Sequence, residues 1–397
     1  MNEAEIAIIG GGIAGVSAAY HLSKLGQRVV LLERDTIAVH ASGRNSGLIS
    51  ATPQRGVSDL ETQFTVGSLE IYRSLQLDQK ADIEFRQSGA LRAIRTEAEA
   101  ELVGKVVDAA ADDAAIRLLS IGEARSIEPE LSPNLLGALL LTRNAQANPV
   151  KATRALAQAA ERQGARIVTQ YEVTDVTRRT DGSYLVRAGD ANVATERLVI
   201  AAGPLASSIG ALLGVEIPVV PVRGQMWATD ALAPQLHHNL SAMESSLHWQ
   251  QARPGTDLPA HLTHRAGQRV TRHLYGRQTR TGEIIFGGDR EMVGYHAEVD
   301  PVGIAANHRH ASKVLPLLAA LPAKRHCAAL MPFSRDGRCL VGPVPGQPCL
   351  WLSAGMASSG FGEAPMAGSL LAMWMHTGWR PDLLAAADPA ARVHVRG

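Results

Sequence analysis

The sequence predicts a mixed α/β fold with two interleaved domains, one built on a parallel sheet and one on an antiparallel sheet. Residues 5–33 follow the order strand, glycine-rich turn, helix and second strand, which is a βαβ unit. A buried strand ending in small residues returns at 196–203. Between 225 and 325, polar and apolar residues alternate around repeated turn signals, which is typical of an antiparallel sheet.

The domain organisation follows from length and from where these patterns leave off and return. A chain of 397 residues suits two domains, and 46% hydrophobic residues predict a globular protein. We expect the first domain, of the Rossmann type, to be discontinuous and the substrate domain to fill the gaps. The first comprises 1–75, 145–224 and 326–397, and the second comprises 76–144 and 225–325.

The elements are predicted in order along the chain. The βαβ unit has strands at 6–9 and 28–32 around a helix over 13–22 that stops at Gly26. The next predictions are a helix at 61–80, strand-like pieces at 83–85 and 89–94, a helix at 97–114, a loop at 129–149, a helix from Pro149 to Gln163, and strands at 165–168, 171–176 and 196–203. The proline-punctuated segment 216–224 leaves the first domain, and 326–397 supplies closing strands and a final helix.

Composition excludes some classes of partner. Lys and Arg (39) nearly balance Asp and Glu (38), and no basic block occurs, so we expect no nucleic-acid partner. Cys327, Cys339 and Cys349 are too widely spaced for a redox or zinc pair and are interpreted as buried thiols in a reducing compartment. The absence of a leader pattern and of a run of about 20 apolar residues predicts a cytoplasmic protein, with peripheral contact at the inner membrane left open.

A dinucleotide fingerprint lies in the first βαβ unit. Gly10-Gly11-Gly12-Ile13-Ala14-Gly15 supplies G-x-G-x-x-G directly after a strand, and Glu33 ends the next strand. The glycines permit a tight turn, close approach of a pyrophosphate to the helix N-terminus, and close helix packing. A carboxylate at position 33 suits a ribose diol and repels a 2′-phosphate. The candidate contacts are Gly10, Gly12, Ile13, Ala14, Gly15, Glu33 and Arg34.

A second segment, residues 40–49, favours flavin over nicotinamide. Its small residues permit close backbone approach, and its polar residues offer donors to phosphate or ring atoms. A nicotinamide dehydrogenase needs no such second clasp, so we expect FAD. The candidate contacts in this clasp are Ser42, Gly43, Arg44, Asn45, Ser46, Gly47 and Leu48.

Five blocks spread along the chain carry a family resemblance. They are IAIIGGGIAGVSAAYHLSKLGQRVVLLER (6–34), HASGRNSG (40–47), LVIAAGP (198–204), RDGRCLVGPVPG (335–346) and SAGMASSGFGEAPMAG (353–368). With these blocks the chain resembles the FAD-dependent oxidoreductases of the D-amino-acid oxidase type, which include glycine and sarcosine oxidases, dimethylglycine dehydrogenase and bacterial D-amino-acid dehydrogenases.

The resemblance implies further cofactor contacts and an activity. Val173 would lie against the adenine, and the remaining contacts would be Ala201, Ala202, Gly203, Gly355, Ser358, Ser359, Gly360, Phe361 and Gly362. The implied reaction removes hydride from a C–N bond of a small amine or amino acid and gives an imine that hydrolyses. The reduced flavin would pass its electrons to oxygen, a quinone or a protein acceptor.

His40 has three open interpretations. In the resembling dimethylglycine dehydrogenases a histidine at this position of the motif is joined covalently to the flavin, whereas some D-amino-acid dehydrogenases keep it unattached near the active site. A structural role is the third possibility. No metal is predicted, because His237-His238 and the pair His308 and His310 lack the acids and thiols of a metal site.

The substrate contacts are less well marked. The family's carboxylate-binding arginines are replaced here by Met331 and Ser358, so either an anion is held elsewhere or the substrate is not a simple amino acid. The candidate arginines are Arg277, Arg335 and Arg44. His273 and Tyr275 alternate along one predicted strand and would share a face. The predicted catalytic set is His40, His273, Tyr275 and Arg277.

Two alternatives to amine oxidation remain open. A flavin-dependent 2-hydroxy-acid dehydrogenase would need a base to take the hydroxyl proton, and His40 or His273 could serve. A flavoprotein subunit of a multi-subunit amine or opine oxidase would bind partner subunits and show little activity alone.

Overall fold

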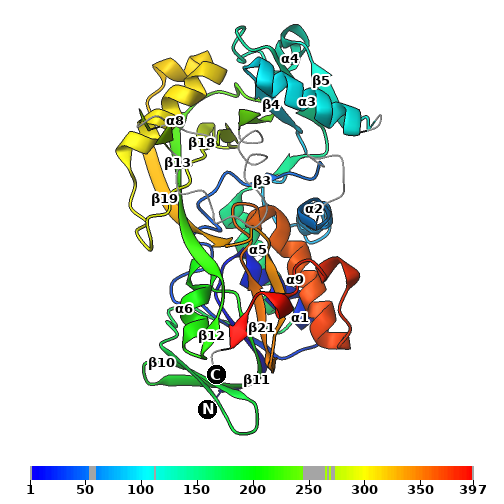
Figure 1. Ribbon diagram of the computed structural model, residues 1–397, viewed down its shortest axis with the longest axis vertical. Coiled ribbons are helices and arrows are strands. Elements are labelled where there is room, and N and C mark those ends of the chain that lie inside the picture. The colour runs from blue at the N-terminus through cyan, green and yellow to red at the C-terminus, as the bar shows by residue number, and fades with distance from the viewer. Residues whose placement is uncertain are drawn as a thin grey trace.

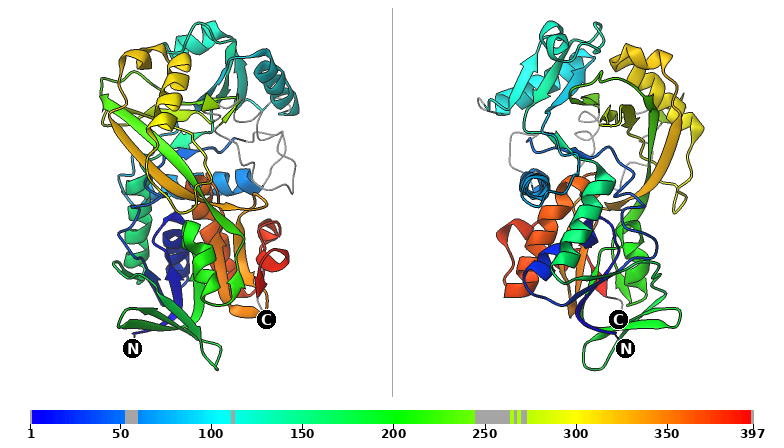
Figure 2. Two further views of the ribbon diagram at one scale, coloured as in Figure 1. Left: turned by 60° about the vertical axis from the view of Figure 1, so that its left-hand side comes forward. Right: turned by 180° about the vertical axis from the view of Figure 1, so that it is seen from behind.

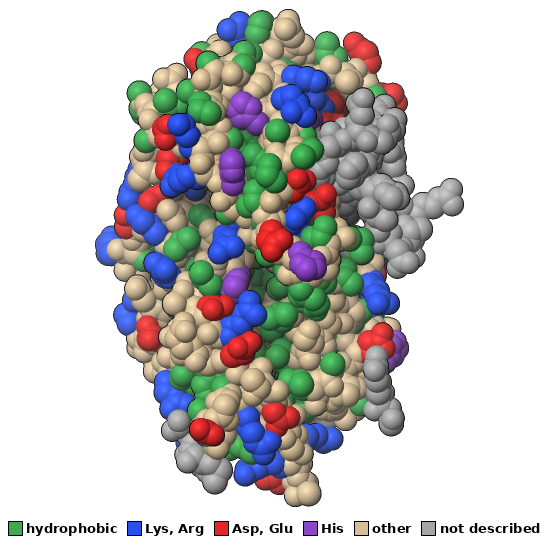
Figure 3. Space-filling view, turned by 90° about the vertical axis from the view of Figure 1, so that its left-hand side faces the viewer, with side chains coloured by type: hydrophobic (Ala, Val, Ile, Leu, Met, Phe, Trp, Pro, Cys, Tyr) green, Lys and Arg blue, Asp and Glu red, His purple; other side chains and the backbone are tan. Residues whose placement is uncertain are grey.

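The computed structural model describes residues 2–52, 60–110, 113–244, 264–265, 268–269 and 273–395. Two lobes are visible in Figure 1, each built around one large sheet. The predicted mixed α/β fold is confirmed. On the face drawn in Figure 3, basic and acidic side chains are interspersed, in line with the near balance of charges in the sequence.

The lower lobe holds a largely parallel sheet. Its main strands in spatial order are β20 (Leu340–Val344), β21 (Gln347–Ala354), β11 (Ala191–Ile200), β1 (Asn2–Ile9), β2 (Val29–Leu32) and β8 (Arg166–Val168). The ladders from β21 to β8 are parallel, and β20 joins β21 antiparallel. A hairpin of β9 (Asp175–Arg178) and β10 (Tyr184–Ala188) pairs with β11. This is the sheet that the βαβ pattern predicts.

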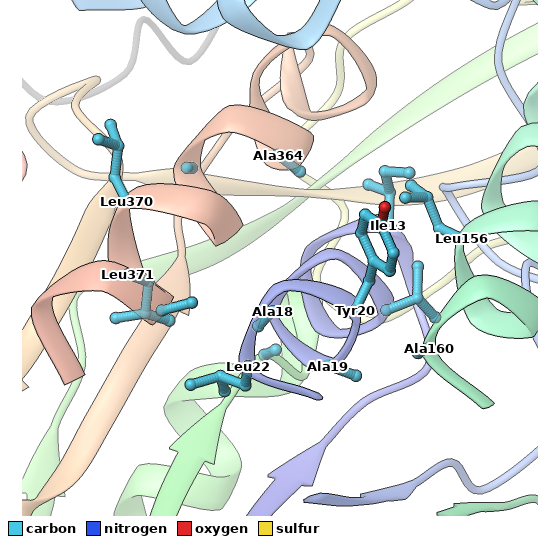
Figure 4. Close-up of a cluster of buried hydrophobic side chains, with 14 of the residues drawn as sticks. Ile13, Ala18, Ala19, Tyr20, Leu22, Leu156, Ala160, Ala364, Leu370 and Leu371 are labelled. Carbon is cyan, nitrogen blue, oxygen red and sulfur yellow. The ribbon is translucent and has the colours of Figure 1, made fainter. Parts of the chain in front are cut away.

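Helices α1 (Ile13–Lys24), α5 (Pro149–Arg162) and α9 (Gly360–Thr377) share one core on one face of that sheet. Figure 4 shows α1 between the other two, with Tyr20 directed toward Leu156 of α5 and with Leu371 of α9 on the opposite side. A methyl group on Gly368 of α9 would stand 2.8 Å from the backbone of α1. The two helix backbones can therefore touch only because this residue has no side chain.

The upper lobe holds the second sheet. Its spatial order is β19 (Arg325–Ser334), β13 (Val219–Ala231), β18 (Glu283–Gly287), β17 (Tyr275–Gln278), β14 (Asn239–Ala242), β4 (Ala90–Ile94), β6 (Gly137–Leu141) and β5 (Ile116–Leu119). All neighbouring pairs are antiparallel except β14 with β4, which is parallel. Parts of the predicted sheet region 225–325, at 245–263, 266–267 and 270–272, lie outside the described residues.

Helices cover both faces of the upper sheet. The far face packs on α4 (Ile121–Ile127) and α8 (Pro301–Val314), and α3 (Glu97–Ala109) covers the near face only at the β4–β5 end. The rest of the near face looks toward the lower lobe. The long strands β13 and β19 pair from Val219–Ser334 to Ala228–Arg325 and run between the lobes, as the views in Figure 2 show.

The remaining elements are shorter or connect the lobes. They are β3 (Leu48–Ile49), α2 (Leu60–Leu77), β7 (Ala145–Gln146), α6 (Ala206–Ala211), β12 (Val215–Glu216), β15 (His264–Arg265), β16 (Gln268–Arg269) and β22 (His394–Val395). Among the described residues, no helix combines the length and apolar character needed to cross a membrane.

Three local predictions are wrong. The predicted loop 129–149 contains β6, because its apolar run Gly137–Leu141 is wholly buried between β4 and β5. The strand predicted at 171–176 begins only at Asp175, since the Tyr171 N–H donates instead to the Glu33 carbonyl beyond the end of β2. Residues 83–85 form no strand, and Glu84 has a φ of 56°.

The cysteine prediction holds for one thiol of three. Cys339 is buried, and burial raises the pKa of its thiol far above the usual range. Cys327 and Cys349 are only partly buried.

We predict that Gly368→Ala destabilises the protein by about 1–3 kcal/mol, because the added methyl group forces the backbones of α9 and α1 apart. Gly104→Ala in α3 is the matched control, since its methyl group meets no atom within 4 Å. That control should stabilise the helix by about 0.5–1 kcal/mol. Urea unfolding measures both. A Gly368→Ala protein as stable as the Gly104→Ala protein would contradict this packing.

Candidate active site

A cavity of about 1020 Å³ lies between the two sheets. Its lower wall is made by the carboxyl ends of β1, β2, β11 and β21, and its upper wall by the near face of the second sheet. Ligands of open α/β sheets bind at the carboxyl ends of the strands. Both sequence fingerprints therefore open onto the site where the fold favours a ligand.

The glycine turn between β1 and α1 has no room for side chains. Gly10 has a φ of 115°, and a Cβ there would lie 2.4 Å from the Ala201 carbonyl oxygen. A Cβ on Gly15 would lie 1.9 Å from the Gly10 carbonyl oxygen. Gly12, Ile13 and Ala14 line the cavity. The turn thus brings the first N–H groups of α1 to the cavity wall, where the helix dipole favours an anion.

The clasp of residues 40–49 is hydrogen-bonded to the start of α1, next to the glycine turn. Ser42 Oγ accepts a hydrogen bond from the Ile13 N–H at 2.8 Å. The Asn45 amide donates to the carbonyls of Ala41 and Ser42 and accepts from the Gly47 N–H, so it folds its own loop. The predicted contacts of this clasp that line the cavity are Ser42, Arg44, Asn45, Ser46 and Leu48.

Gly43 and Gly47 have a different role from their neighbours, because neither lines the cavity. A Cβ on Gly43 would lie 1.9 Å from the Ala38 carbonyl oxygen, and one on Gly47 would lie 1.9 Å from that of Ala147. These glycines allow the clasp to pack against the chain behind it.

Glu33 joins the end of β2 to the glycine turn. Its carboxylate is buried and accepts from the N–H groups of Gly11 at 2.6 Å and Asp35 at 2.8 Å. His40 lies at the same end of the cavity, where its Nε2 is 2.6 Å from Asp35 Oδ2 and 3.2 Å from the Arg34 guanidinium. The His40 hydrogen bond is the main cause that lowers the pKa of Asp35.

The same corner holds the described residues whose spacing suits a metal ion. Ligand atoms of Glu33, Asp35 and His40 all lie within 4.8 Å of one another. The two Glu33 oxygens already accept backbone N–H groups, and His40 already pairs with Asp35. These hydrogen bonds account for the cluster.

Segments from the other strands complete the lower wall. Val173 lines the cavity, as do Ala201, Ala202 and Gly203 after β11. After β21, Gly355 turns the chain with a φ of 73°, and Ser358, Ser359, Gly360, Phe361 and Gly362 follow on the cavity wall. Because α9 begins at Gly360, the positive end of an 18-residue helix faces the cavity. The Tyr72 hydroxyl donates to the Phe361 carbonyl at 2.6 Å and holds this helix start.

The predicted histidine and tyrosine near the start of β17 reach the cavity, but the predicted arginine does not. His273 and Tyr275 both line it, and burial raises the pKa of the Tyr275 hydroxyl. Arg277 is 3% exposed, and its guanidinium donates to the carbonyl oxygens of Ser46 at 2.5 Å and Ala147 at 3.3 Å. It braces the clasp from above. The hypothesis that Arg277 binds substrate therefore finds no support in its position.

Two arginines that no sequence motif indicated line the upper part of the cavity. Arg290 follows β18, stands over the Phe333 ring at 5.5 Å from its centroid, and donates to Ser358 Oγ at 2.7 Å. Arg92 comes from the middle of β4. Burial lowers the pKa of each to about 10, so both remain cations at neutral pH.

Sequence signals for these two arginines were weak. Arg92 was detectable only as the single charged residue in the buried run ALRAI, and Arg290 lies in a loop with no motif. Arg44 and Arg335 also line the cavity. Arg44 donates to the Ala328 carbonyl at 3.0 Å, and Arg335 is exposed.

The two positions where the resembling family has arginines are part of the same wall. Met331 and Ser358 both line the cavity. Their side chains carry no charge, so any cation that binds an anionic substrate here must come from another position.

Comparisons with known proteins agree with this geometry. Residues 5–374 match the model of a family described as FAD dependent oxidoreductase. Mitochondrial dimethylglycine dehydrogenase of Mus musculus is 26% identical over 399 residues, which cover 98% of this chain and 44% of the relative. Glycine oxidase of Geobacillus kaustophilus is 25% identical over 374 residues, covering 93% and 92%. The chain thus spans less than half the length of the first of these relatives.

A solved structure shares the fold over nearly the whole chain. The crystal structure of glycine oxidase from Geobacillus kaustophilus superposes with a TM-score of 0.83 at 22% identity, covering 98% of each chain.

The residues of the lower wall fit FAD as the cofactor. Gly10 and Gly15 leave no space for a Cβ at the turn, so the backbone can approach a pyrophosphate closely. The Glu33 carboxylate ends β2 at the same wall, and the starts of both α1 and α9 face one cavity. Two positive helix ends suit an elongated ligand with an anionic centre and an electron-rich ring.

We predict that Gly12→Val yields a folded protein that loses FAD. The branched side chain would stand where the pyrophosphate approaches, and its Cβ would already be 3.0 Å from Ser42 Oγ. The ratio of flavin to protein absorbance after purification measures retention. Gly104→Ala is the control and should purify yellow. A Gly12→Val protein with a full complement of flavin would show that this turn does not hold the cofactor.

Proposed function

We propose that this chain, which belongs to the FAD dependent oxidoreductase family, oxidises the C–N bond of a small amine or amino acid, such as a D-amino acid or an N-alkyl amino acid. The observation that carries the proposal is the position of Arg290 on the wall of the FAD cavity, hydrogen-bonded to Ser358 in the loop before α9. A cation at that point suits the carboxylate of an amino acid.

Arg290 offers a reason for the departures at Met331 and Ser358. The guanidinium reaches the glycine loop from the upper lobe, and the Ser358 hydroxyl and Phe333 ring hold it in place. A cation supplied by another element can bind the anion that the missing arginines would bind. The candidate for this carboxylate contact is therefore Arg290 in place of Arg277.

The chain's own residues need only bind, orient and desolvate the substrate. When bound, FAD accepts a hydride from the carbon next to an uncharged amine. Arg290 orients the substrate through its carboxylate, and the apolar side chains of Met331 and Phe333 exclude water around the reacting carbon. Partial desolvation lowers the pKa of the substrate ammonium and favours its neutral form. The substrate gives up a hydride and releases an N–H proton to solvent water, and water then converts the imine to a carbonyl compound and an amine or ammonia.

The position of His273 favours a second candidate function, a flavin-dependent 2-hydroxy-acid dehydrogenase. His273 is 3% exposed, lies on the cavity wall and is two residues from Tyr275, which also lines it, so it suits a base for a hydroxyl proton. The acceptor for the flavin electrons (oxygen, a quinone or a protein), any partner subunits and the cytoplasmic location stay predictions.

We predict that anaerobic addition of amino acids or N-methyl amino acids bleaches the flavin. Losing a hydrogen-bonded charge costs about 1.5–3 kcal/mol, so Arg290→Met should raise the Kd for amino acids by about 10- to 150-fold. For amines without a carboxylate, the Kd should change by less than about threefold, because these amines make no ion pair with Arg290. Stopped-flow bleaching at varied substrate concentration separates the Kd from the rate of bleaching.

Arg154→Met, which replaces an exposed arginine on α5, is the control and should behave as the unmodified protein. Bleaching by 2-hydroxy acids alone would favour the alternative function. If Arg290→Met changed the Kd equally for amino acids and for amines without a carboxylate, Arg290 would have no role in substrate binding. The proposed reaction class would still stand.

A further inference from the structure

We infer that the substrate carries a second anionic group, which Arg92 binds, so that the substrate class is an amine with two carboxylates. This inference rests on the proposed function, and it narrows the substrate from amino acids in general to amino or imino dicarboxylates. It comes from the upper wall of the cavity, where two partly buried arginines stand on different elements.

The first observation is a row of residues in register across the upper sheet. Tyr275 pairs with Ser241 of β14, and Ser241 pairs with Arg92 of β4. Residues directly opposite one another on neighbouring strands point to the same face of a sheet. All three line the cavity, which agrees with that rule. Arg92 therefore belongs to the same wall as the predicted substrate contact Tyr275.

The second observation is where Arg92 stands on that face. Its strand neighbours at two residues' distance, Ala90 and Ile94, pack in the apolar cluster beneath α3. Arg92 is on the same face but reaches the cavity, so it marks the border between a covered and an open part of the sheet. An arginine placed at such a border can bring its charge to an anionic ligand in the cavity.

The third observation is the spacing of the two cations. Arg92 and Tyr275 are two strands apart, which places their Cα atoms about 9–10 Å from each other. Arg290 lies on the Tyr275 side, where the two side chains interact electrostatically. The two guanidinium groups thus flank Tyr275 and Ser241. A ligand lying across these two residues can present one anion to each arginine.

One of the acidic residues that line the cavity lies near Arg290. Glu61, at the start of α2, lines the same cavity and attracts Arg290. The two cations complement a molecule with two carboxylates. A monocarboxylic amino acid would offer an anion to only one of the two arginines.

Binding of unreactive carboxylates to the FAD-loaded protein tests this without requiring turnover. The probes are butyrate, with one carboxylate, and succinate and glutarate, with two. Perturbation of the flavin absorbance and the shift in Tm both report the Kd. We expect the better dicarboxylate to bind at least about tenfold more tightly than butyrate, as a second charged hydrogen bond provides.

The variants assign the effect to Arg92. Arg92→Met should reduce the dicarboxylate preference to about twofold or less while leaving butyrate binding unchanged, and Arg92→Lys should keep part of it because the charge remains. Arg117→Met, which replaces an exposed arginine of the same sheet, should keep the full preference.

Equal binding of butyrate and dicarboxylates, or equal losses in Arg92→Met and Arg117→Met, would overturn the inference. If Arg92→Met does not fold, Arg92→Lys replaces it, and an undiminished preference in that variant counts against an arginine contact.

The two proposals can fail separately. Bleaching by N-methylglycine at the same Kd as by iminodiacetate would overturn the second anion site and leave amine oxidation standing. Tight binding of dicarboxylates with no bleaching by any amine would overturn the proposed function and leave the two-anion site.

Discussion

The structure depends on one close contact, the approach of the turn between β1 and α1 to the neighbouring strand β11. Gly10 packs against the Ala201 carbonyl, and Gly15 packs against the Gly10 carbonyl. A Cβ on either glycine would overlap the carbonyl oxygen that it faces. Glu33 then ties the end of β2 to the same turn through the Gly11 N–H. Three parallel strands and one helix start are thereby held together, and the cavity forms at the edge where all of them end.

The upper lobe supports this arrangement as well as covering it. Arg277 reaches down from β17 to the carbonyls of Ser46 and Ala147, and the Arg44 guanidinium reaches up to the Ala328 carbonyl of β19. The clasp of residues 40–49 is thus fastened to the upper sheet at two points. An arginine that a sequence pattern offers as a substrate contact can be required instead to hold the cofactor loop, because guanidinium groups satisfy buried carbonyl oxygens as well as carboxylates.

The side of the cavity that we propose for the substrate is built from positions on separate strands. Tyr275, Ser241 and Arg92 come from three strands far apart in the chain and meet only through pairing register. Arg290 joins them from a loop and reaches Ser358 in the segment before α9. The same cofactor wall can therefore serve different substrates when a few charges on the upper sheet are exchanged, which fits a family whose relatives are named for different amines.

The sequence by itself determined the first βαβ unit and the cofactor class, and the family resemblance implied the rest of the lower wall. Those features depend on local rules, because glycines at fixed offsets and a strand-ending carboxylate act within about 30 residues of one another. Only the tertiary structure decided the strand within 129–149, the bracing role of Arg277, and the presence of Arg92 and Arg290 in the cavity. Their positions follow from long-range strand pairing, and a residue's facing partner across a sheet cannot be read from its neighbours in the chain.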